Sequence, residues 1–271
     1  MKILQVFILT FFNFWIYAQD SLNLNVITKI DQVSKLIEVD KMGQIYLVTD
    51  DHSLLKYDAE GKFLKSFNEN SLGAIYSVDV SNPFQPMLYF DEYQTVIVLD
   101  RSLSEMYRFN LAALNLIQVN AIGMSTDNMA WFYDPNSFKL KKINRSTTVE
   151  LESPDLSGIL DASFQPSSLR ELNFNVYLND PEKGIMVFDN FANYIRTIEV
   201  VGIKNFRIDH SKLYWLDTTL NLKSIDLKSF KEYALDLKKS NVSMEHLKDL
   251  IIYQDKFLLQ LDHYILICAK L

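Results

Sequence analysis

Six aspartates recur along the chain, and each comes just after a stretch of apolar and aromatic residues. Successive members are 41, 43, 46, 37 and 45 residues apart. Carboxylates gathered on one face would attract a basic partner, and oxygen ligands of this kind are those that calcium takes. Aspartate also closes tight turns by accepting hydrogen bonds from its own backbone, and we expect turn chemistry to account for most of the set. The six are Asp50, Asp91, Asp134, Asp180, Asp217 and Asp262, and Asp51, Glu92 and Glu182 lie near them.

The other reactive residues do not form a pattern that predicts catalysis. The histidines at positions 52, 210, 246 and 263 lie in different stretches, whereas zinc needs three or four ligands brought together. Cys268 lies in the apolar stretch YILICAK, so we expect it to be buried and inert. The chain has no G-x-S-x-G motif and no glycine-rich phosphate loop. We therefore expect no catalytic residue and no cofactor, with calcium as the metal that the carboxylates would suit; a triad assembled from distant stretches stays open, because triads are recognised by geometry.

Loop aromatics are a second kind of candidate site. In the stretch SNPFQPMLYF, residues 81–90, Phe84 lies between two prolines, and Met87 lies between the second proline and a strand. Phe138, Phe191 and Tyr194 also lie near turns. Aromatic residues and methionine are enriched at protein interfaces, although loop residues of this kind often fold back on the protein. We count Phe84 and Met87 as candidate partner-binding residues together with the acidic turns.

The elements that position these residues form a repeat. Each aspartate lies between two runs that read as strands, a third run follows in most units, and an earlier run precedes the first. A repeat of about 40–45 residues with four strands is typical of a β-propeller. The strands are apolar on both sides, which fits blades packed face to face. We predict an all-β, six-bladed β-propeller with four-stranded antiparallel blades; its clearest strand pairs begin at Ile45, Leu88, Ala130, Val176, Leu213 and Phe257.

The two ends of the repeat predict how the ring closes. The sixth unit stops after three strands, and an unassigned strand at Leu22 to Ile30 precedes the first unit. Closure removes an exposed sheet edge, so we expect Leu22 to Ile30 to pair beside Tyr264 to Lys270. For the fourth unit, GILDASF at residues 158–164 is the best candidate for the first strand. SMEHLKDL at residues 243–250 is the best candidate for a short helix.

The stretch from Gly43 to Phe67 resembles an NHL-type repeat. It has Gly43, the strand IYLV, Asp50 and His52, then a strand ending in Tyr57 and Asp58, and then Gly-Lys-Phe-Leu and a closing Phe67. Ser53 stands where that family often has arginine. The resemblance implies a six-bladed propeller and no particular activity, because propellers carry many functions.

Composition and the first residues indicate where the protein works. Residues 1–19 combine Lys2, a long apolar run and a small residue at Ala18, which is typical of a cleaved secretory signal peptide. We therefore expect a signal peptide at 1–19, one propeller domain at 20–271, and no membrane span after cleavage. The net charge of −7 without basic clusters argues against nucleic acid as a partner. Glycine is scarce, at 7 residues, so we expect asparagine and aspartate to occupy left-handed turn positions.

Together these patterns predict a secreted or periplasmic propeller that acts as a non-catalytic scaffold. Its expected partner is a protein, within an envelope or outer-membrane complex, and the expected location is periplasmic, outer-membrane-associated or extracellular. Two alternatives remain: a metal-dependent hydrolase of the lactonase type, and a binder of glycans or small ligands. An enzyme would bring metal-capable side chains together at the mouth of the channel.

Overall fold

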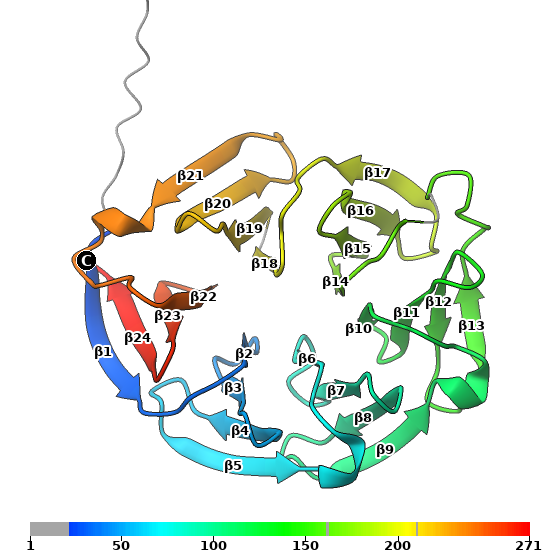
Figure 1. Cartoon of the computed structure of the whole chain (residues 1–271), viewed down its shortest axis with the longest axis horizontal. Coiled ribbons are helices and arrows are strands. Elements are labelled where there is room, and N and C mark those ends of the chain that lie inside the picture. The colour runs from blue at the N-terminus through cyan, green and yellow to red at the C-terminus, as the bar shows by residue number, and fades with distance from the viewer. Residues whose placement is uncertain (1–21, 161–162, 210) are drawn as a thin grey trace, which may run out of the picture.

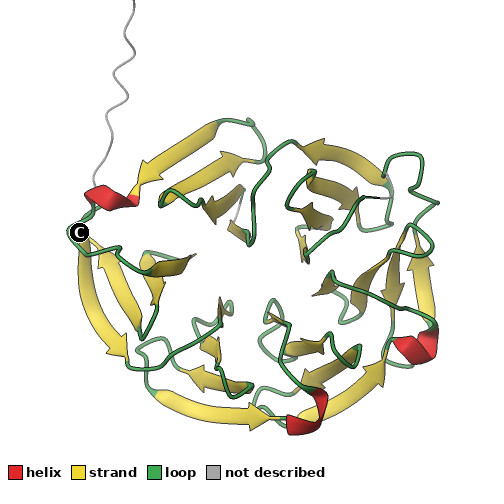
Figure 2. Ribbon diagram, in the orientation of Figure 1, coloured by secondary structure: helices red, strands yellow, loops and turns green. Residues whose placement is uncertain are grey.

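The computed structural model describes residues 22–160, 163–209 and 211–271. They form six four-stranded antiparallel sheets around a central axis, as blades of a propeller (Figures 1 and 2). The predicted six-bladed fold is therefore confirmed. In each blade the first strand lies next to the axis and the fourth lies outermost (Figure 1). The predicted signal peptide, residues 1–19, lies outside the described residues.

The first three blades use consecutive strands. Blade one contains β2 (Leu36–Val39), β3 (Ile45–Val48), β4 (Ser53–Tyr57) and β5 (Phe63–Asn68). Blade two contains β6 (Ser77–Asp79), β7 (Met87–Phe90), β8 (Thr95–Leu99) and β9 (Glu105–Asn110). Blade three contains β10 (Ile122–Met124), β11 (Ala130–Asp134), β12 (Lys139–Ile143) and β13 (Val149–Glu152).

Blades four and five follow the same order, and blade six takes its outermost strand from the N-terminal part of the chain. Blade four contains β14 (Ser168–Leu172), β15 (Asn175–Asp180), β16 (Gly184–Asp189) and β17 (Tyr194–Ile198). Blade five contains β18 (Arg207–Asp209), β19 (Lys212–Leu216), β20 (Asn221–Asp226) and β21 (Glu232–Asp236). Blade six contains β22 (Leu247–Tyr253), β23 (Lys256–Leu261), β24 (Ile265–Lys270) and the N-terminal β1 (Leu24–Ile30).

The N-terminal strand closes the ring as predicted. β1 pairs antiparallel with β24, with Leu24 opposite Lys270 and Ile30 opposite Ile265. The Asn241 side chain adds a clamp on the free side of this strand: its Oδ1 accepts from the Leu24 N–H at 2.7 Å, and its Nδ2 donates to the Leu24 carbonyl at 2.8 Å. The amide thus satisfies backbone groups that an edge strand would leave open.

Two local predictions were wrong. The first strand of blade four is β14 rather than the predicted stretch 158–164, of which residues 161 and 162 lie outside the described residues. The SLREL sequence of β14 carries charged side chains, so a search for an apolar run misses it. Residues 243–250 are not a helix: β22 begins at Leu247. In the part of the chain that the structure describes, helical turns occur as three 3₁₀ segments, namely η1 (Asn70–Leu72), η2 (Ala112–Leu114) and η3 (Leu237–Lys239). Within the described residues, no helix is long and apolar enough to cross a membrane.

The turns explain how so few glycines suffice. At Asp100, for example, one carboxylate oxygen accepts from the N–H groups of residues 102 and 104, and Leu103 between them takes a left-handed φ of 59°. The same arrangement recurs at Asp189, with Ala192 at φ 63°. Among the described residues, asparagine does occupy left-handed positions but aspartate does not. Aspartate instead opens the turn, where its carboxylate holds the backbone for the strained residue.

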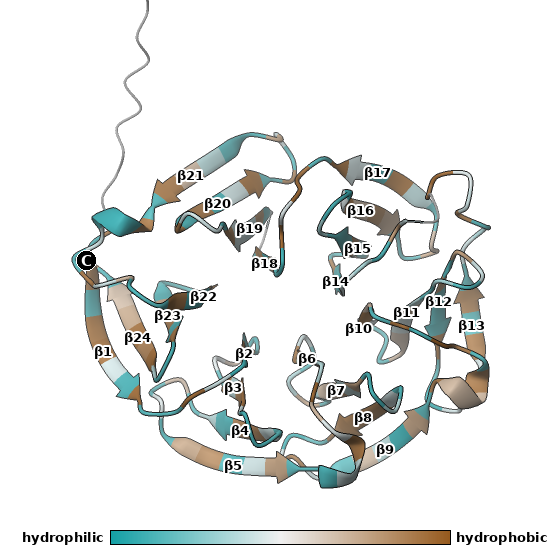
Figure 3. Cartoon of the chain, in the orientation of Figure 1, coloured by the Kyte–Doolittle hydropathy of each residue, from teal (hydrophilic) through white to brown (hydrophobic). Residues whose placement is uncertain are grey.

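The core lies between neighbouring blades, because each sheet buries both of its faces. Brown, apolar positions recur along the strands of every blade in Figure 3. Trp131, Tyr46 and Tyr89 are among the largest fully buried side chains. Blades three and four approach closely at Gly123, where an added Cβ would lie 2.7 Å from the Leu169 carbonyl oxygen. A glycine is therefore required there by space rather than by backbone conformation.

Candidate functional site

Alternation of strand direction divides the loops between two faces of the ring. The turns between second and third strands, and the links between blades, lie on one face, which we call the link face. The turns between first and second strands, and between third and fourth strands, lie on the other, which we call the hairpin face. The six predicted turn acids therefore lie on the link face, one per blade. They stand at different depths and have different partners.

Three of the turn acids, Asp134, Asp180 and Asp217, accept hydrogen bonds from backbone N–H groups in their own turns. Asp134 accepts from the Asn136 N–H, the Ser137 hydroxyl and Lys141 Nζ, the last at 2.7 Å. Asp180 is buried and accepts from the backbone N–H groups of Gln165 and Glu182. Burial opposes ionisation of Asp134, but these donors outweigh it and lower the pKa of that carboxyl. Turn chemistry thus accounts for these residues, as expected.

Asp217 belongs to the same group. Its Oδ1 accepts from the Thr219 and Asn221 N–H groups at 2.9 and 2.8 Å. Burial would raise the pKa of Asp217, and these bonds outweigh it and lower the pKa to about 2. Lys223 Nζ lies 3.5 Å from the same carboxylate.

The remaining acids are more exposed. Asp262 pairs with Lys248 at 3.2 Å and with His246 at 3.0 Å, and the Lys248 bond lowers its pKa. Lys35 Nζ lies 3.7 Å from Asp50 Oδ1. The Thr49 hydroxyl donates to Asp51 and lowers its pKa. The rest of this group, Asp91, Glu92 and Glu182, stand at half-buried or exposed turn positions. Lysines therefore stand beside several of these carboxylates, so the link face is mixed in charge.

Phe84 and Met87 separate in the structure. Phe84 lies on the hairpin face in the loop between β6 and β7 and is exposed, with Arg101 over its ring. Met87 is not a loop residue: it begins β7, is 2% exposed and packs in the core between blades two and three. The prolines of this loop made the strand start look later than it is. Met87 is thus unavailable to a partner.

Other loops of the hairpin face also expose large apolar side chains. They occur between first and second strands and between third and fourth strands, in blades one, two, four and five. Two of the aromatic residues, Phe174 and Phe230, have left-handed φ angles of 62° and 57°. The exposed residues are Met42, Phe84, Phe174, Phe191 and Phe230.

The candidate metal and nucleophile residues stay apart. Within the described part of the chain, no group of three or more His, Cys, Asp and Glu side chains could hold a metal ion. His210 lies outside the described residues. Cys268 is buried in β24, and burial raises the pKa of its thiol to about 11, as expected for an inert cysteine.

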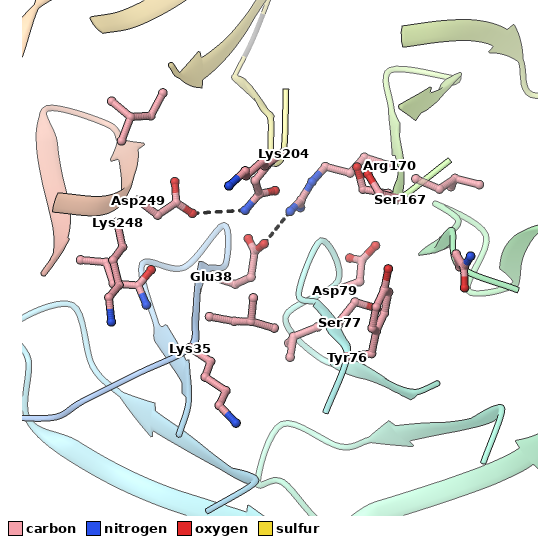
Figure 4. Close-up of a pocket in the computed structure, with 18 of the residues that line it drawn as sticks. Lys35, Glu38, Tyr76, Ser77, Asp79, Ser167, Arg170, Lys204, Lys248 and Asp249 are labelled. Carbon is pink, nitrogen blue, oxygen red and sulfur yellow. Dashed lines mark hydrogen bonds and ion pairs between the residues drawn. The ribbon is translucent and has the colours of Figure 1, made fainter. Parts of the chain in front are cut away.

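Two cavities occupy the central channel. The larger, of about 550 Å³, opens on the link face and is lined by the starts of the first strands of blades one, two, three, four and six, and by the link and the turn of blade five (Figure 4). The smaller, of about 340 Å³, opens on the hairpin face at the ends of the first strands of blades one, two, four, five and six. Glu38, Asp79 and Arg170 line both cavities and so mark the neck between them.

A chain of ion pairs crosses this neck. Arg170 Nη2 lies 2.5 Å from Glu38 Oε1, and Arg207 Nε lies 3.4 Å from Glu38 Oε2. Arg207 Nη2 lies 3.0 Å from Asp249 Oδ2 and also donates to the Ile37 carbonyl at 3.1 Å. The Arg207 side chain is only 8% exposed. Burial alone would lower its pKa, but the Glu38 and Asp249 carboxylates outweigh it and raise the pKa of Arg207.

Sequence reasoning missed the residues of the neck. Glu38, Arg170, Arg207 and Asp249 lie in first strands, where a charge is expensive to bury unless it is paired. A charged residue inside the short inner strand of five of the six blades was the available signal. Glu171, next to Arg170, is a further example: it accepts from Ser125, Thr126 and Trp131, and so ties blade four to blade three.

No family model matches the chain, and no curated protein matches it in sequence. Many solved structures share its fold. The WD40 domain of Neurospora crassa Pan2 matches with a TM-score of 0.62 and 10% identity over 93% of this chain and 95% of that one. Virginiamycin B lyase from Staphylococcus aureus matches with a TM-score of 0.58 and 9% identity over 93% and 96%. BamB from Moraxella catarrhalis matches with a TM-score of 0.50 and 10% identity over 86% and 81%. At such low identity these likenesses show the propeller fold alone and leave activity open.

Proposed function

We propose that this chain is an exported, non-catalytic propeller that binds a protein partner through its hairpin face. The observation that carries the proposal is Phe174. It is the second residue of the two-residue turn between β14 and β15, has a φ of 62° and is 67% exposed. A left-handed backbone costs a residue with a side chain about 1–2 kcal/mol, and such turns prefer glycine. Neither burial nor backbone preference explains an aromatic there, which leaves a contact outside the chain as its reason.

Neighbouring loops support the same surface. Phe230 repeats the combination of exposure and left-handed backbone, and the Arg196 guanidinium lies 4.0 Å from the centre of its ring. Met42, Phe84 and Phe191 add exposed apolar side chains on the same face. Aromatic residues, methionine and arginine are the residues enriched in protein interfaces.

The finer parts of the proposal rest on sequence. Residues 1–19 support export, and export supports a place in an envelope complex. BamB contributes only a likeness of fold. We retain the NHL-type repeat as a resemblance of residues 43–67. The acidic link face stays a prediction for a basic partner, although neighbouring lysines reduce its negative potential.

The hydrolase alternative has less support from the geometry. A metal-dependent hydrolase needs a cluster of ligands with an open position. The described residues of the channel are engaged otherwise: Glu38 and Asp249 pair with arginines, and Asp79 accepts from backbone N–H groups. A calcium site on the link face stays a proposal of lower rank.

The experiment compares Phe174→Gly with a link-face control, Tyr93→Gly, in co-purification from solubilised envelope. Glycine relieves the left-handed backbone at position 174, so we expect the variant to be at least as stable as wild type in thermal unfolding. We expect it to lose the partner that wild type and the control retain. Equal retention by all three proteins would overturn the proposed surface. A clear loss of stability in Phe174→Gly would show instead that the ring serves the fold.

A further inference from the structure

The link-face cavity has the size and lining of a small-ligand site. Its volume of about 550 Å³ falls within the range of about 300–1,000 Å³ that is usual for such sites. Its walls combine apolar side chains with polar groups from every blade, and Figure 4 shows polar side chains directed into it from several blades. The apolar part of the wall includes Leu36, Val78, Ile122, Leu169, Leu216, Leu220 and Leu247.

The carboxylates at the floor of this cavity already have donors. Asp79 accepts from the Ser81 and Met124 N–H groups, both at 2.8 Å. The two oxygens of Glu38 face Arg170 and Arg207. The carboxylates of the floor are therefore engaged, and a ligand cation would find no free counter-charge among them.

Both carboxylate oxygens of Asp249 also have donors within the chain. Its Oδ2 accepts from Arg207 and from Asn205 at 3.0 and 3.2 Å, and its Oδ1 accepts from the Leu250 N–H at 2.8 Å. Asp249 is the third floor carboxylate, so the acidic side of the cavity is satisfied within the chain.

Several donors of the same cavity lack acceptors among the described residues. Arg170 donates from Nη2 to Glu38, but its Nε is covered and has no partner. The Ser168 hydroxyl, two residues earlier on β14, is also covered and unpartnered. Lys204 lines the rim and has no ion pair within the described chain, and its exposed ammonium has room to move. Arg170 and Lys204 can only donate, and the Ser168 hydroxyl can donate as well as accept, so an acceptor from outside would suit all three.

We propose that the link-face cavity binds a carboxylate carried on a compact apolar body, with Arg170 and Lys204 as its cationic partners. The guanidinium fork is suited to a planar carboxylate. The three acids of the floor disfavour a dianion such as phosphate more strongly than a monoanion. Tyr76 lies half-exposed at the rim and offers an aromatic wall to the apolar body. Its ring packs edge-on to that of Tyr89, with 5.9 Å between the two ring centres.

This site is independent of the proposed protein surface, because it opens on the opposite face of the ring. Two sources of the ligand share the chemistry: the C-terminal residue of a peptide and a free organic acid. A binding assay with defined probes distinguishes them. The probes are N-acetyl-leucine, its amide, an acetylated tripeptide ending in leucine with a free carboxylate, and inorganic phosphate.

The proteins compared are wild type, Arg170→Gln and Lys204→Gln, with Lys62→Gln as the control. Lys62 is an exposed lysine on the hairpin face, so its substitution removes the same charge elsewhere. By calorimetry we expect N-acetyl-leucine to bind wild type and Lys62→Gln equally. We expect at least tenfold weaker binding by Lys204→Gln and Arg170→Gln, where tenfold corresponds to about 1.4 kcal/mol. Lys204→Gln keeps the test decisive if Arg170→Gln does not fold, because Lys204 is exposed and outside the ion-pair chain.

The amide should bind wild type at least tenfold more weakly than the acid. Tighter binding of the tripeptide identifies a peptide end as the source, and equal binding identifies a free acid; both support the site. The proposal is overturned if the amide equals the acid, if phosphate binds more tightly, if Lys204→Gln equals the control, or if no probe binds at about 10 mM, far above typical dissociation constants. Phe174→Gly should bind N-acetyl-leucine like wild type, so failure here and failure of the hairpin-face proposal are separate results.

Discussion

Replacing Leu24 with alanine is expected to destabilise the whole ring. Leu24 lies at the start of β1, is 2% exposed and packs in the cluster that contains Phe257 and Leu259. A buried leucine replaced by alanine costs about 2–5 kcal/mol, depending on how far the site collapses. Because β1 is an outermost strand that can partly relax, we expect about 3 kcal/mol. In a chain of this size that lowers the melting temperature by about 6–12 °C.

The assay is urea unfolding followed by tryptophan fluorescence, with Val26→Ala as the matched control. Val26 lies in the same strand but is 44% exposed, so its truncation should change the free energy of unfolding by less than about 0.5 kcal/mol. Trp131 is fully buried in β11 of blade three, and β11 lies across the ring from β1 (Figure 1), so this side chain reports on a part of the propeller distant from the substitution.

Two results would refute this reasoning. Equal effects of Leu24→Ala and Val26→Ala would show that burial in β1 does not stabilise the ring. Faster amide exchange in β24 without a change in the Trp131 unfolding midpoint would show that the closing strand frays alone. In that case the ring would not depend on closure for its global stability, and blade six would be a separate local unit.

Three further substitutions test other contacts. Glu38→Ala removes the acid between two buried arginines and should cost about 3–5 kcal/mol in urea unfolding, against almost nothing for exposed Glu60→Ala; similar costs would mean that the neck is not held by its ion pairs. Gly123→Ala places a Cβ against the Leu169 carbonyl and should cost about 1–3 kcal/mol, whereas Gly158→Ala, with nothing within 4 Å, should be near neutral; equal stabilities would contradict the close approach of blades three and four. Asp134 has a pKa below its ordinary value of 3.8, so its ionised form stabilises the fold above that pH, and this stability is lost as the pH falls through the lower folded value. Asp134→Asn should therefore be less stable than wild type at neutral pH, and the gap should close in acid; a gap that stays constant with pH would exclude ionisation as its source.

The fold was predictable from sequence because one physical requirement repeats. Each blade needs an apolar strand, a turn that begins with a hydrogen-bonding side chain, and a second apolar strand, and these recur as in IYLVTDDHSLLKYD. The closing strand was predictable for a related reason, since an incomplete last blade leaves an edge that a free strand can cover. Strand starts were harder to predict. The SLREL sequence of β14 places Arg170 and Glu171 within an inner strand, so the apolar pattern that defines most strands is interrupted.

The acidic turns illustrate a limit of spacing as evidence. The period places one carboxylate per blade on one face, but it does not determine what each carboxylate contacts. Asp180 is buried in its own turn, whereas Asp50 stands exposed beside Lys35. Met87 shows the same limit for loops, because a residue three positions after exposed Phe84 is already in the core. Contacts of this kind depend on neighbouring strands that are distant in sequence.

The channel site was hidden for a reason that also suggests how to find such sites. Its residues come from the first strands of five blades and from the link and the turn of the sixth, so successive contributions lie tens of residues apart and share no motif. They do share a register: Glu38, Arg170 and Arg207 each stand opposite a tyrosine of the second strand. In a propeller, equivalent inner-strand positions surround the same point on the axis. Opposite charges at that register therefore predict an ion-pair network across the channel, and any charge in excess of its partners predicts a ligand of opposite sign.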